Sequence, residues 1–166
     1  LEERLKNLSI TDPLTGVYNM RYFVERLEHE IGRFNRYGDQ FSVIMLDLDH
    51  FKSINDDFGH DKGDEVLVGT VSTIKSRIRS IDVLARWGGE EFVLLLPSTD
   101  KEGAVALAKD LRLKLREKDY SIGRKVTASF GITSISLGDT VDTIMKRADD
   151  MLYTAKASGR DCVMGV

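Results

Sequence analysis

Acidic side chains crowd one stretch of the sequence, residues 47–65. Seven aspartates and glutamates stand there against two lysines, so the stretch carries a charge of −5 in a chain whose total charge is −3. Asp47 and Asp49 lie two residues apart and therefore point to the same side wherever the chain is extended. Because carboxylates at the end of a buried strand are costly unless cations or hydrogen bonds satisfy them, the stretch is a candidate cation site.

Calcium fits this stretch poorly. An EF-hand loop that began at Asp47 would need an oxygen ligand at its fifth position, a glycine at its sixth and a glutamate at its twelfth. The sequence has Phe51, Lys52 and Phe58 at those positions. Magnesium fits better, because it takes one or two carboxylates and keeps positions for water and phosphate oxygens. Helix capping and solvation remain the alternative for several of these acids.

A second group, Arg-Trp-Gly-Gly-Glu-Glu-Phe at residues 86–92, combines two glycines with two acids. Gly88 and Gly89 support a tight two-residue turn between strands. Two residues without side chains would also let a flat ligand lie against the backbone, with the Glu90 carboxylate beside it. Strand alternation places Glu90 and Glu91 on opposite faces, which predicts different tasks for the two glutamates.

Basic residues form two further groups. Lys156 and Arg160 flank a predicted helix end, where the helix dipole favours cations and where they could also bind phosphate oxygens. Arg79 and Asp82 lie on the segment that leads into the two glycines, and a basic group there is most simply solvated surface. Carboxylates, cations and phosphate-binding donors together are the general equipment of phosphoryl and nucleotidyl transfer.

Hydrophobic periodicity predicts the elements that position these groups. Helical spacing predicts helices over residues 19–36, 61–79 and 141–155, and a further helix that opens with a Thr99/Glu102 capping box. Strands are predicted over residues 41–48, 81–87, 92–96, 126–132 and 162–166. The order β-α-α-β-β-α-β-α-β, with one hairpin, excludes a purely parallel doubly wound sheet. It predicts an α+β sandwich of the ferredoxin-like kind, a central mixed antiparallel sheet flanked by helices.

Length and composition limit the class of protein. The 166 residues suit one domain, and the net charge of −3 with a pI near 5.7 predicts no nucleic-acid or membrane surface. The single cysteine, Cys162, excludes a disulfide framework and most zinc sites. The histidines have no metal-ligand spacing. We therefore expect a cytoplasmic globular domain without nucleic-acid or membrane contact.

The first residues form a unit of their own in this interpretation. Leu1, Leu5 and Leu8 are spaced as one heptad, and the chain begins with leucine rather than methionine. We expect residues 1–10 to be the tail of an N-terminal helical connector from an upstream domain, and residues 11–166 to be the catalytic domain.

Five motifs in order resemble those of the GGDEF domain family, the diguanylate cyclases, which join two GTP molecules into cyclic di-GMP. They occupy residues 12–16 (DPLTG), 47–55 (DLDHFKSIN), 58–64 (FGHDKGD), 88–92 (GGEEF) and 156–160 (KASGR). The resemblance implies a nucleotide-cyclase-like sandwich. Departures are few: Glu90 stands where the family name has aspartate, Trp87 where tyrosine is common, and Asp161 where asparagine is common.

The resemblance also implies roles for individual residues. Asp47, the backbone carbonyl of Leu48 and Glu90 would bind two Mg²⁺ ions, with Mn²⁺ as the alternative metal. Glu90 or Glu91 would help to activate the attacking 3′-hydroxyl, and which of them is the base stays open. The implied catalytic residues are Glu90, Glu91, Lys52, Gly88 and Gly89.

Substrate and product sites follow from the same resemblance. Asn55 and Asp64 would read the guanine edge, since a carboxylate can accept from two guanine N–H groups and adenine offers no such pair. The other implied substrate-binding residues are Phe51, Lys52, His60, Lys156 and Arg160, with the amides near Phe51 and Lys52 around the terminal phosphates. Arg79 and Asp82 match the Arg-x-x-Asp inhibitory site, where the product binds.

The implied reaction needs two domains that face each other across a two-fold axis, each with one GTP, and hence a homodimer. A sensor domain would lie upstream. Two alternatives stay open: a catalytically silent module that binds GTP or cyclic di-GMP as a sensor, and a cyclase for another base. The filled positions Asp47, Glu90 and Glu91 argue against the first, and Asn55 with Asp64 against the second.

Overall fold

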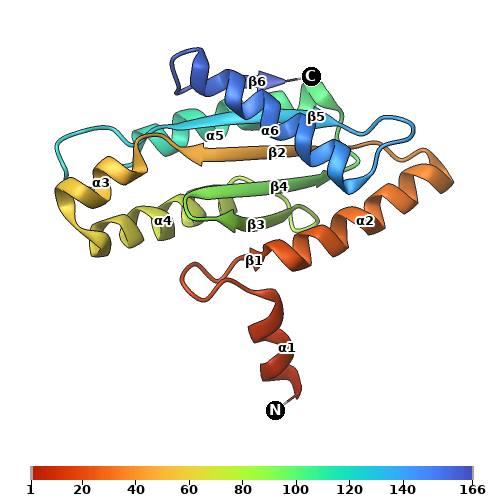
Figure 1. The fold of residues 1–166 in the computed structure, drawn as a ribbon, viewed down its shortest axis with the longest axis horizontal. Coiled ribbons are helices and arrows are strands. Elements are labelled where there is room, and N and C mark those ends of the chain that lie inside the picture. Colours follow the sequence, from red (N-terminus) through yellow and green to blue (C-terminus); the bar gives the residue numbers. More distant parts are fainter. Residues whose placement is uncertain (1, 166) are drawn as a thin grey trace.

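Within residues 2–165, the part of the chain that this computed structural model describes, a six-stranded mixed sheet carries helices on both faces (Figure 1). In chain order the strands are β1 (Tyr18–Asn19), β2 (Phe41–Leu48), β3 (Val83–Gly88), β4 (Glu91–Pro97), β5 (Ala128–Ser134) and β6 (Val163–Gly165). The helices are α1 (Glu2–Ile10), α2 (Met20–Tyr37), α3 (Phe51–Phe58), α4 (His60–Lys75), α5 (Lys101–Glu117) and α6 (Val141–Ala157).

The sheet order is β1-β3-β4-β2-β5-β6. Its four central strands, β3, β4, β2 and β5, pair antiparallel with one another, and the edge strands β1 and β6 pair parallel with β3 and β5. Helices α3 and α4 connect β2 to β3, and α5 connects β4 to β5. This is the split β-α-β arrangement of a ferredoxin-like fold, so the predicted α+β sandwich is confirmed.

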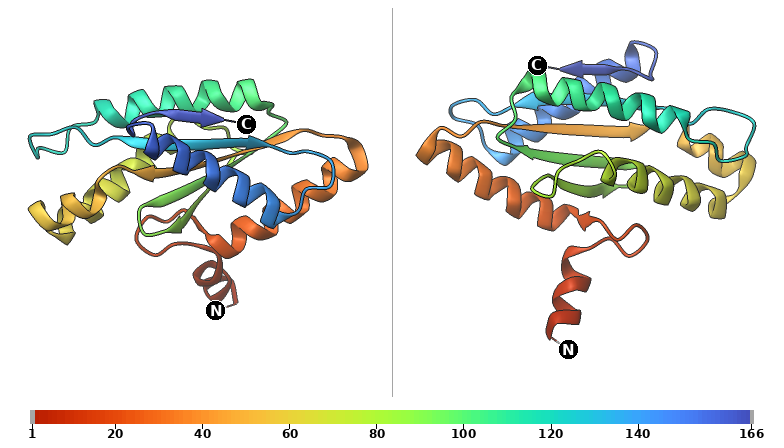
Figure 2. Two further views of the ribbon diagram at one scale, coloured as in Figure 1. Left: turned by 45° about the horizontal axis from the view of Figure 1, so that its top comes forward. Right: turned by 180° about the vertical axis from the view of Figure 1, so that it is seen from behind.

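Strand β2 is central because it is apolar on both faces, and all eight of its residues are buried. Ile44 and Leu46 pack into the core beneath α4 and α5. Val43 and Met45 point the other way, into the core beneath α2 and α6. Figure 1 has α6 in front of the sheet, and the right-hand view of Figure 2, seen from behind, has α4 and α5 in front. The C-terminal end of β2 is therefore held rigidly from both faces.

Helix α6 lies close against β5 because position 131 is glycine. A Cβ atom at Gly131 would come within 2.3 Å of the Ala148 carbonyl oxygen and the Leu152 amide nitrogen. No side chain fits between two backbones at that separation. Gly131 thus fixes the height of α6 above the sheet.

Of the two predicted helix caps, one is confirmed and one differs from the structure. Asn19 caps α2 as predicted, since its side chain accepts a hydrogen bond from the Tyr22 amide. The Thr99/Glu102 capping box is wrong: Asp100 is the N-cap of α5 and accepts from the Gly103 amide at 2.9 Å. The Thr99 hydroxyl is used elsewhere, donating to the Pro97 carbonyl and accepting from Arg79.

The hairpin turn lies one residue later than predicted. Gly88 still belongs to β3 and pairs with Glu91, so Gly89 and Glu90 occupy the turn. The cause is a register irregularity between Arg86 and Gly88, which inserts one residue into β3. Gly89 has a φ of 41°, in the left-handed region that glycine adopts readily.

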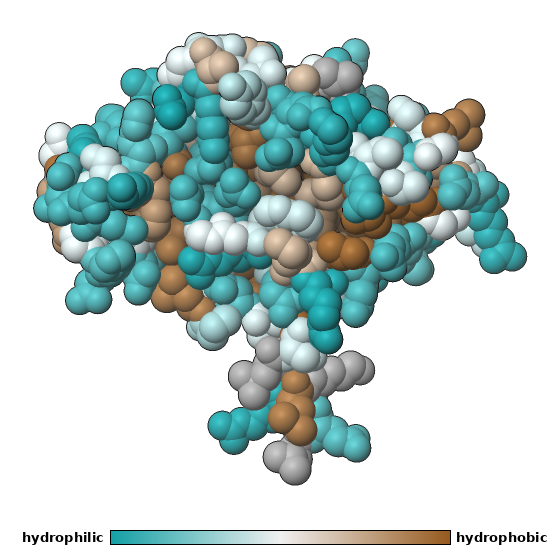
Figure 3. Space-filling model, in the orientation of Figure 1, coloured by the Kyte–Doolittle hydropathy of each residue, from teal (hydrophilic) through white to brown (hydrophobic). Residues whose placement is uncertain are grey.

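Helix α1 projects away from the sheet (Figure 1). Its Leu5 side chain is exposed, whereas Leu1 and the side chain of Leu8 lie outside the described residues. The connector over residues 1–10 therefore stays a prediction. No described helix is both long and apolar enough to cross a membrane, and the face in Figure 3 is largely hydrophilic.

Candidate active site

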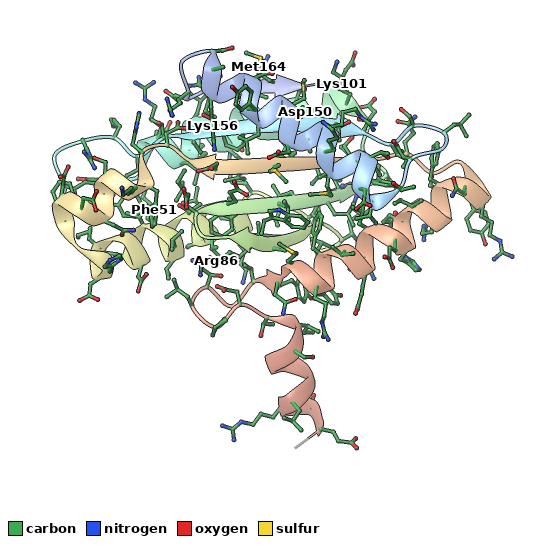
Figure 4. The ribbon with its side chains drawn as sticks, viewed as in Figure 1. Phe51, Arg86, Lys101, Asp150, Lys156 and Met164 are labelled. Atoms are coloured by element: carbon green, nitrogen blue, oxygen red, sulfur yellow. The ribbon has the colours of Figure 1, made fainter. Side chains whose placement is uncertain are left out.

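Three of the five motifs, residues 47–55, 88–92 and 156–160, meet at one end of the sheet. The C-terminal end of β2, the β3–β4 turn, the start of α3 and the last turn of α6 all lie there (Figure 1; Phe51 and Lys156 are labelled in Figure 4). Asp47 pairs with Glu91 in the sheet register, and the Leu48 amide donates to the Glu90 carbonyl at 3.3 Å. The metal-binding candidates are thus brought together by backbone pairing.

Asp47 and Lys156 form the central ion pair of this end of the sheet. The Lys156 Nζ atom lies 2.5 Å from Asp47 Oδ2, and the Asp47 side chain is only 7% exposed. Burial raises the pKa of Asp47 above its ordinary value; Lys156 opposes the shift, while the charges of Glu90 and Asp49 add to it. Burial acts to lower the pKa of Lys156, but Asp47 and the two glutamates outweigh it and raise that pKa. The site is therefore an acidic cluster that attracts further positive charge.

The two glutamates of the hairpin share this acidic environment. Burial raises the pKa of Glu91, and the charge of Asp47 raises it further. Glu91 faces the Asp47 side of the sheet, whereas the next residue, Phe92, packs into the core beneath α4 and α5. Glu90 lies in the turn, so strand alternation does not govern it, and its charge still acts on both Asp47 and Lys156. The prediction that strand alternation places the two glutamates on opposite faces therefore does not apply, because Glu90 is not in a strand. What distinguishes them is that Glu90 lies in the turn and Glu91 in β4.

The start of α3 supplies amide donors beside β2. His50 precedes the helix with a φ of 55°, and the first helical hydrogen bond runs from the Ile54 amide to the His50 carbonyl. The amides of Phe51 and Lys52 stand in the first turn, where N–H groups have no partner within the helix. Phe51 is buried and Lys52 is exposed. Such a helix start suits an anionic group.

The predicted base-reading residues lie on the α3–α4 helix pair. Gly63 packs against Asn55 so closely that a Cβ at Gly63 would meet Asn55 Oδ1 at 1.8 Å. Asp64 follows Gly63 on α4 and is exposed, as is His60 at the start of that helix. The absence of a side chain at Gly63 therefore leaves room for the Asn55 amide, a role that the sequence alone did not assign.

Arg79 and Asp82 stand apart from the other candidates. They precede β3, at the opposite end of that strand from Gly88. The Arg79 guanidinium donates to Asp82 Oδ1 at 2.8 Å and to the Pro97 carbonyl at 2.9 Å, and the Arg79 amide donates to Asp82 Oδ2 at 2.8 Å. The Asp82 side chain is buried while Arg79 is half exposed. The two residues thus form one unit, remote from Asp47.

Asp12 and Arg86 join the hairpin to the segment before β1, and our sequence analysis gave neither residue a role. Arg86 Nε donates to the Gly89 carbonyl at 2.9 Å, and its Nη1 lies 3.3 Å from Asp12 Oδ1. Asp12 also accepts from the amide and the hydroxyl of Thr15. The first motif therefore supports the turn through Arg86. The only indication in the sequence that Asp12 belongs to the site was that residues 12–16 form one of the five ordered motifs.

Asp49 is a further residue to which the sequence assigned no specific role. Its carboxylate accepts from the hydroxyls of Thr127 and Ser129 and from the Asp161 amide. Asp47 contacts Lys156 in the last turn of α6, and Asp49 contacts Asp161 just after that helix. Three protein donors bind the Asp49 carboxylate, whereas the partner of Asp47 is the Lys156 cation, so of the two carboxylates Asp47 is the better candidate for a metal ligand.

Comparison with known proteins agrees with this geometry. Residues 9–162 match the sequence profile of the family described as "Diguanylate cyclase, GGDEF domain". The chain is 42% identical over 164 residues to the response regulator PleD of Caulobacter vibrioides, covering 95% of this chain and 36% of that protein. It is 39% identical to the diguanylate cyclase DgcM of Escherichia coli, covering 99% of this chain and 40% of that protein. The chain therefore spans less than half the length of these relatives.

Solved structures match the fold closely. The active GGEEF domain of a diguanylate cyclase from Vibrio cholerae has a TM-score of 0.85 and 35% identity, covering 89% of this chain and 96% of that one. The coiled coil and GGDEF domain of DgcB from Caulobacter crescentus, in complex with c-di-GMP, has a TM-score of 0.93 and 27% identity, covering 99% and 90%.

Proposed function

Since the chain belongs to the GGDEF domain family, we propose that it is a diguanylate cyclase. It condenses two GTP into one cyclic di-GMP and releases two pyrophosphates. The observation that carries this proposal is the convergence of Asp47, Glu90, Glu91 and Lys156 at one end of the sheet.

Each bond forms by the same displacement. The 3′-oxygen of one GTP attacks the α-phosphorus of the other, a phosphorus–oxygen bond forms, and the bond to the β-phosphate bridging oxygen breaks. The 3′-hydroxyl proton leaves to a nearby base. Glu91 suits that task because its raised pKa makes it a better proton acceptor than an ordinary carboxylate. Glu90, in the turn, is the other candidate.

A divalent metal fits the donor set if a backbone carbonyl, water and phosphate oxygens complete its ligands. Among the described residues no three acidic, histidine or cysteine side chains are grouped so as to hold an ion by themselves. Asp47, Glu90 and the Leu48 carbonyl supply hard oxygen donors, the ligands that Mg²⁺ prefers, and leave positions for water and phosphate. A bound Mg²⁺ would neutralise the triphosphate and polarise its phosphorus–oxygen bonds. We propose Mg²⁺, with Mn²⁺ as the alternative.

The polypeptide itself would bind and orient the nucleotide. The Phe51 and Lys52 amides at the start of α3, with the Lys52 side chain, would hold the terminal phosphates. Lys156 and Arg160 would bind phosphate from the α6 side, with Lys156 partly released from Asp47 when the triphosphate arrives. Gly88 and Gly89 would leave room for the nucleotide against the turn.

Base recognition would fall to the α3–α4 pair. Asn55 and Asp64 offer an amide and a carboxylate, groups that can accept from the guanine N1–H and N2–H donors. His60, at the start of α4, would border the same nucleotide. Adenine presents an acceptor where guanine has the N1–H group, so bound adenine would leave the Asp64 carboxylate facing an acceptor instead of a donor.

One domain would hold one GTP, so the reaction requires a second copy across a two-fold axis. We propose that the active form is a homodimer, brought together by the helical connector and an upstream sensor domain. Cyclic di-GMP would bind at Arg79 and Asp82 and slow turnover. Their distance along β3 from the hairpin leaves this site accessible while substrate is bound.

The test uses the purified chain, alone and with a leucine zipper fused ahead of Leu1. Each is incubated with GTP and Mg²⁺, with a metal-free control, and the nucleotides are separated by chromatography. Magnesium-dependent cyclic di-GMP, formed faster by the zipper fusion, supports the proposal. Absence of product from a fusion that is dimeric and folded would contradict it and favour the silent sensor.

A further inference from the structure

The segment that ends α6 has an unusual backbone. Gly159, Arg160 and Asp161 follow one another with φ values of 110°, 64° and 47°. Glycine adopts such angles readily, but two successive non-glycine residues in the left-handed region are rare and persist only where surrounding contacts hold them. Arg160 is one of the proposed phosphate-binding residues, and its backbone conformation must therefore be stabilised by contacts with other parts of the chain.

Asp49 supplies that support from the sheet. The Asp49 side chain is buried, and its Oδ2 atom accepts from the Asp161 amide at 3.0 Å. Thr127 and Ser129 each donate a hydroxyl to the same carboxylate at 2.7 Å and fix its orientation. The bond to the Asp161 amide joins residues 112 positions apart. It is a charge-assisted bond to a backbone group, one of the stronger kinds of hydrogen bond.

Helix α5 holds the same residue from the other side. Arg112 Nη1 lies 2.9 Å from Asp161 Oδ1 and 3.3 Å from the Asp161 carbonyl oxygen. Asp161 is therefore fixed through its amide by Asp49 and through its side chain by Arg112. At the start of the segment, Lys156 is bound by Asp47. Two carboxylates of one strand end thus hold both ends of the 156–161 segment.

We propose that Asp49 is a positioning residue for nucleotide binding: it holds the Asp161 amide and thereby keeps Arg160 in the conformation that meets the phosphates. The inference rests on the proposed function, because it takes the phosphate groups of GTP as the ligand of Arg160. Asp49 makes no contact with the nucleotide in this account. Its effect on GTP passes through Arg160.

Three substitutions separate positioning from general stability. Asp49→Ala removes the acceptor for the Asp161 amide. Asp49→Asn keeps it, since the amide oxygen can accept from Asp161 and Thr127 while the amide nitrogen donates to Ser129. Ser129→Ala is the matched control: it removes one buried hydrogen bond of the same carboxylate and leaves the bond to Asp161 intact.

The experiment is a double-mutant cycle on nucleotide affinity. Mg²⁺ and a GTP analogue with a methylene group between the α- and β-phosphates are used, so that no pyrophosphate can leave. Asp49→Ala, Arg160→Ala and the double variant are compared with wild type. Each single change is expected to weaken affinity about tenfold, the loss typical of one charge-assisted contact. The double variant should bind no more weakly than Arg160→Ala, because the two residues act as one unit.

The outcomes are distinct. Non-additive losses, with near-normal binding by Asp49→Asn and Ser129→Ala, support the inference. Additive losses, an unchanged affinity in Asp49→Ala, or equal losses in Asp49→Asn and Asp49→Ala would overturn it while the proposed function stands. A wild-type protein that binds no analogue overturns both. If Asp49→Ala does not fold, Asp49→Ser replaces it, because its short hydroxyl cannot reach the Asp161 amide.

Discussion

The Lys156 ammonium group lies 2.5 Å from the Asp47 carboxylate, a contact between residues 109 positions apart in the chain. It connects the last turn of α6 to the end of β2 and places a cation within a group of three carboxylates, Asp47, Glu90 and Glu91. In the proposed reaction this cation is shared between these three carboxylates and the incoming triphosphate. Its removal should therefore weaken substrate binding, and it should also lower the free energy of unfolding, because the buried Asp47 carboxylate loses its partner.

Replacing Lys156 with methionine tests that expectation. The methionine keeps most of the aliphatic stem and loses the charge, so we expect KM for GTP to rise by about 10- to 100-fold, the loss of one charge-assisted contact. Lys146→Met is the control, because Lys146 lies on the same helix and, among the described residues, pairs with exposed Asp150. Steady-state kinetics measure both. An unchanged KM in Lys156→Met would remove this residue from phosphate binding.

Gly63→Ala tests how base recognition is built. Its Cβ would meet Asn55 Oδ1 at 1.8 Å, so the Asn55 amide must move away. We expect the preference for GTP over ATP, measured as a ratio of kcat/KM values, to fall about tenfold, since one hydrogen bond of this kind contributes that much. Gly32→Ala is the matched helical control, because a Cβ there meets nothing within 4 Å. A preserved ratio in folded Gly63→Ala would contradict the assignment of Asn55.

Arg79→Ala tests the product site. The substitution removes the exposed guanidinium, while the Arg79 amide can still donate to Asp82. Progress curves of cyclic di-GMP should then continue linearly to higher product concentration. Arg77→Ala is the control: Arg77 lies two residues away and forms a comparable bidentate pair with Asp110. Curves that coincide for wild type and Arg79→Ala would show that this site does not regulate the domain.

The Asp139–Arg147 pair makes a prediction about stability and pH. The two side chains meet at 2.7 Å, and the Asp139 side chain is 7% exposed. Hydrogen bonds from Arg147, followed by those from the Ser136 amide and Thr143, hold the pKa of Asp139 below its ordinary value against the opposing effect of burial. A carboxyl group with a lowered pKa stabilises the fold above its unfolded pKa, and that stabilisation is lost as the pH falls through the folded pKa.

Asp139→Asn should accordingly lower the free energy of unfolding by about 2 kcal/mol near pH 7, the typical cost of disrupting a partly buried charged pair. The difference from wild type should shrink below about pH 4, the ordinary aspartate pKa. Urea unfolding across this range measures it. A difference that stays constant down to pH 2.5 would mean that the charge of Asp139 contributes nothing.

The apolar pattern was sufficient to predict most of the fold. β2 was recognisable because its unbroken apolar run matches a strand buried on both faces, and Asn19 because a cap depends only on local sequence. The turn was misplaced because the irregularity near Trp87 depends on pairing between strands. The α5 cap was misplaced because Thr99 is engaged by Arg79, twenty positions away.

The candidate site, like the fold, has residues that could be predicted from the sequence and residues that could not. Motif order brought Asp47, Glu90 and Lys156 to attention, and pairing between β2 and β4 brings the first two together. Asp12, Asp49 and Gly63 could not be given roles, because each acts through a contact with a distant or tightly packed partner. Sequence spacing reports side-chain type and direction, and it carries no information on such contacts.

The central claim is best tested by the stoichiometry of one reaction. The zipper-fused chain, with Mg²⁺ and GTP, should release two pyrophosphates for each cyclic di-GMP formed. The matched Glu90→Gln fusion should fold normally and lose at least about 100-fold in rate, since a metal-binding carboxylate is replaced by a neutral amide. Pyrophosphate without cyclic dinucleotide, or an unimpaired Glu90→Gln variant, would contradict the assignment of this end of the sheet as a diguanylate cyclase site.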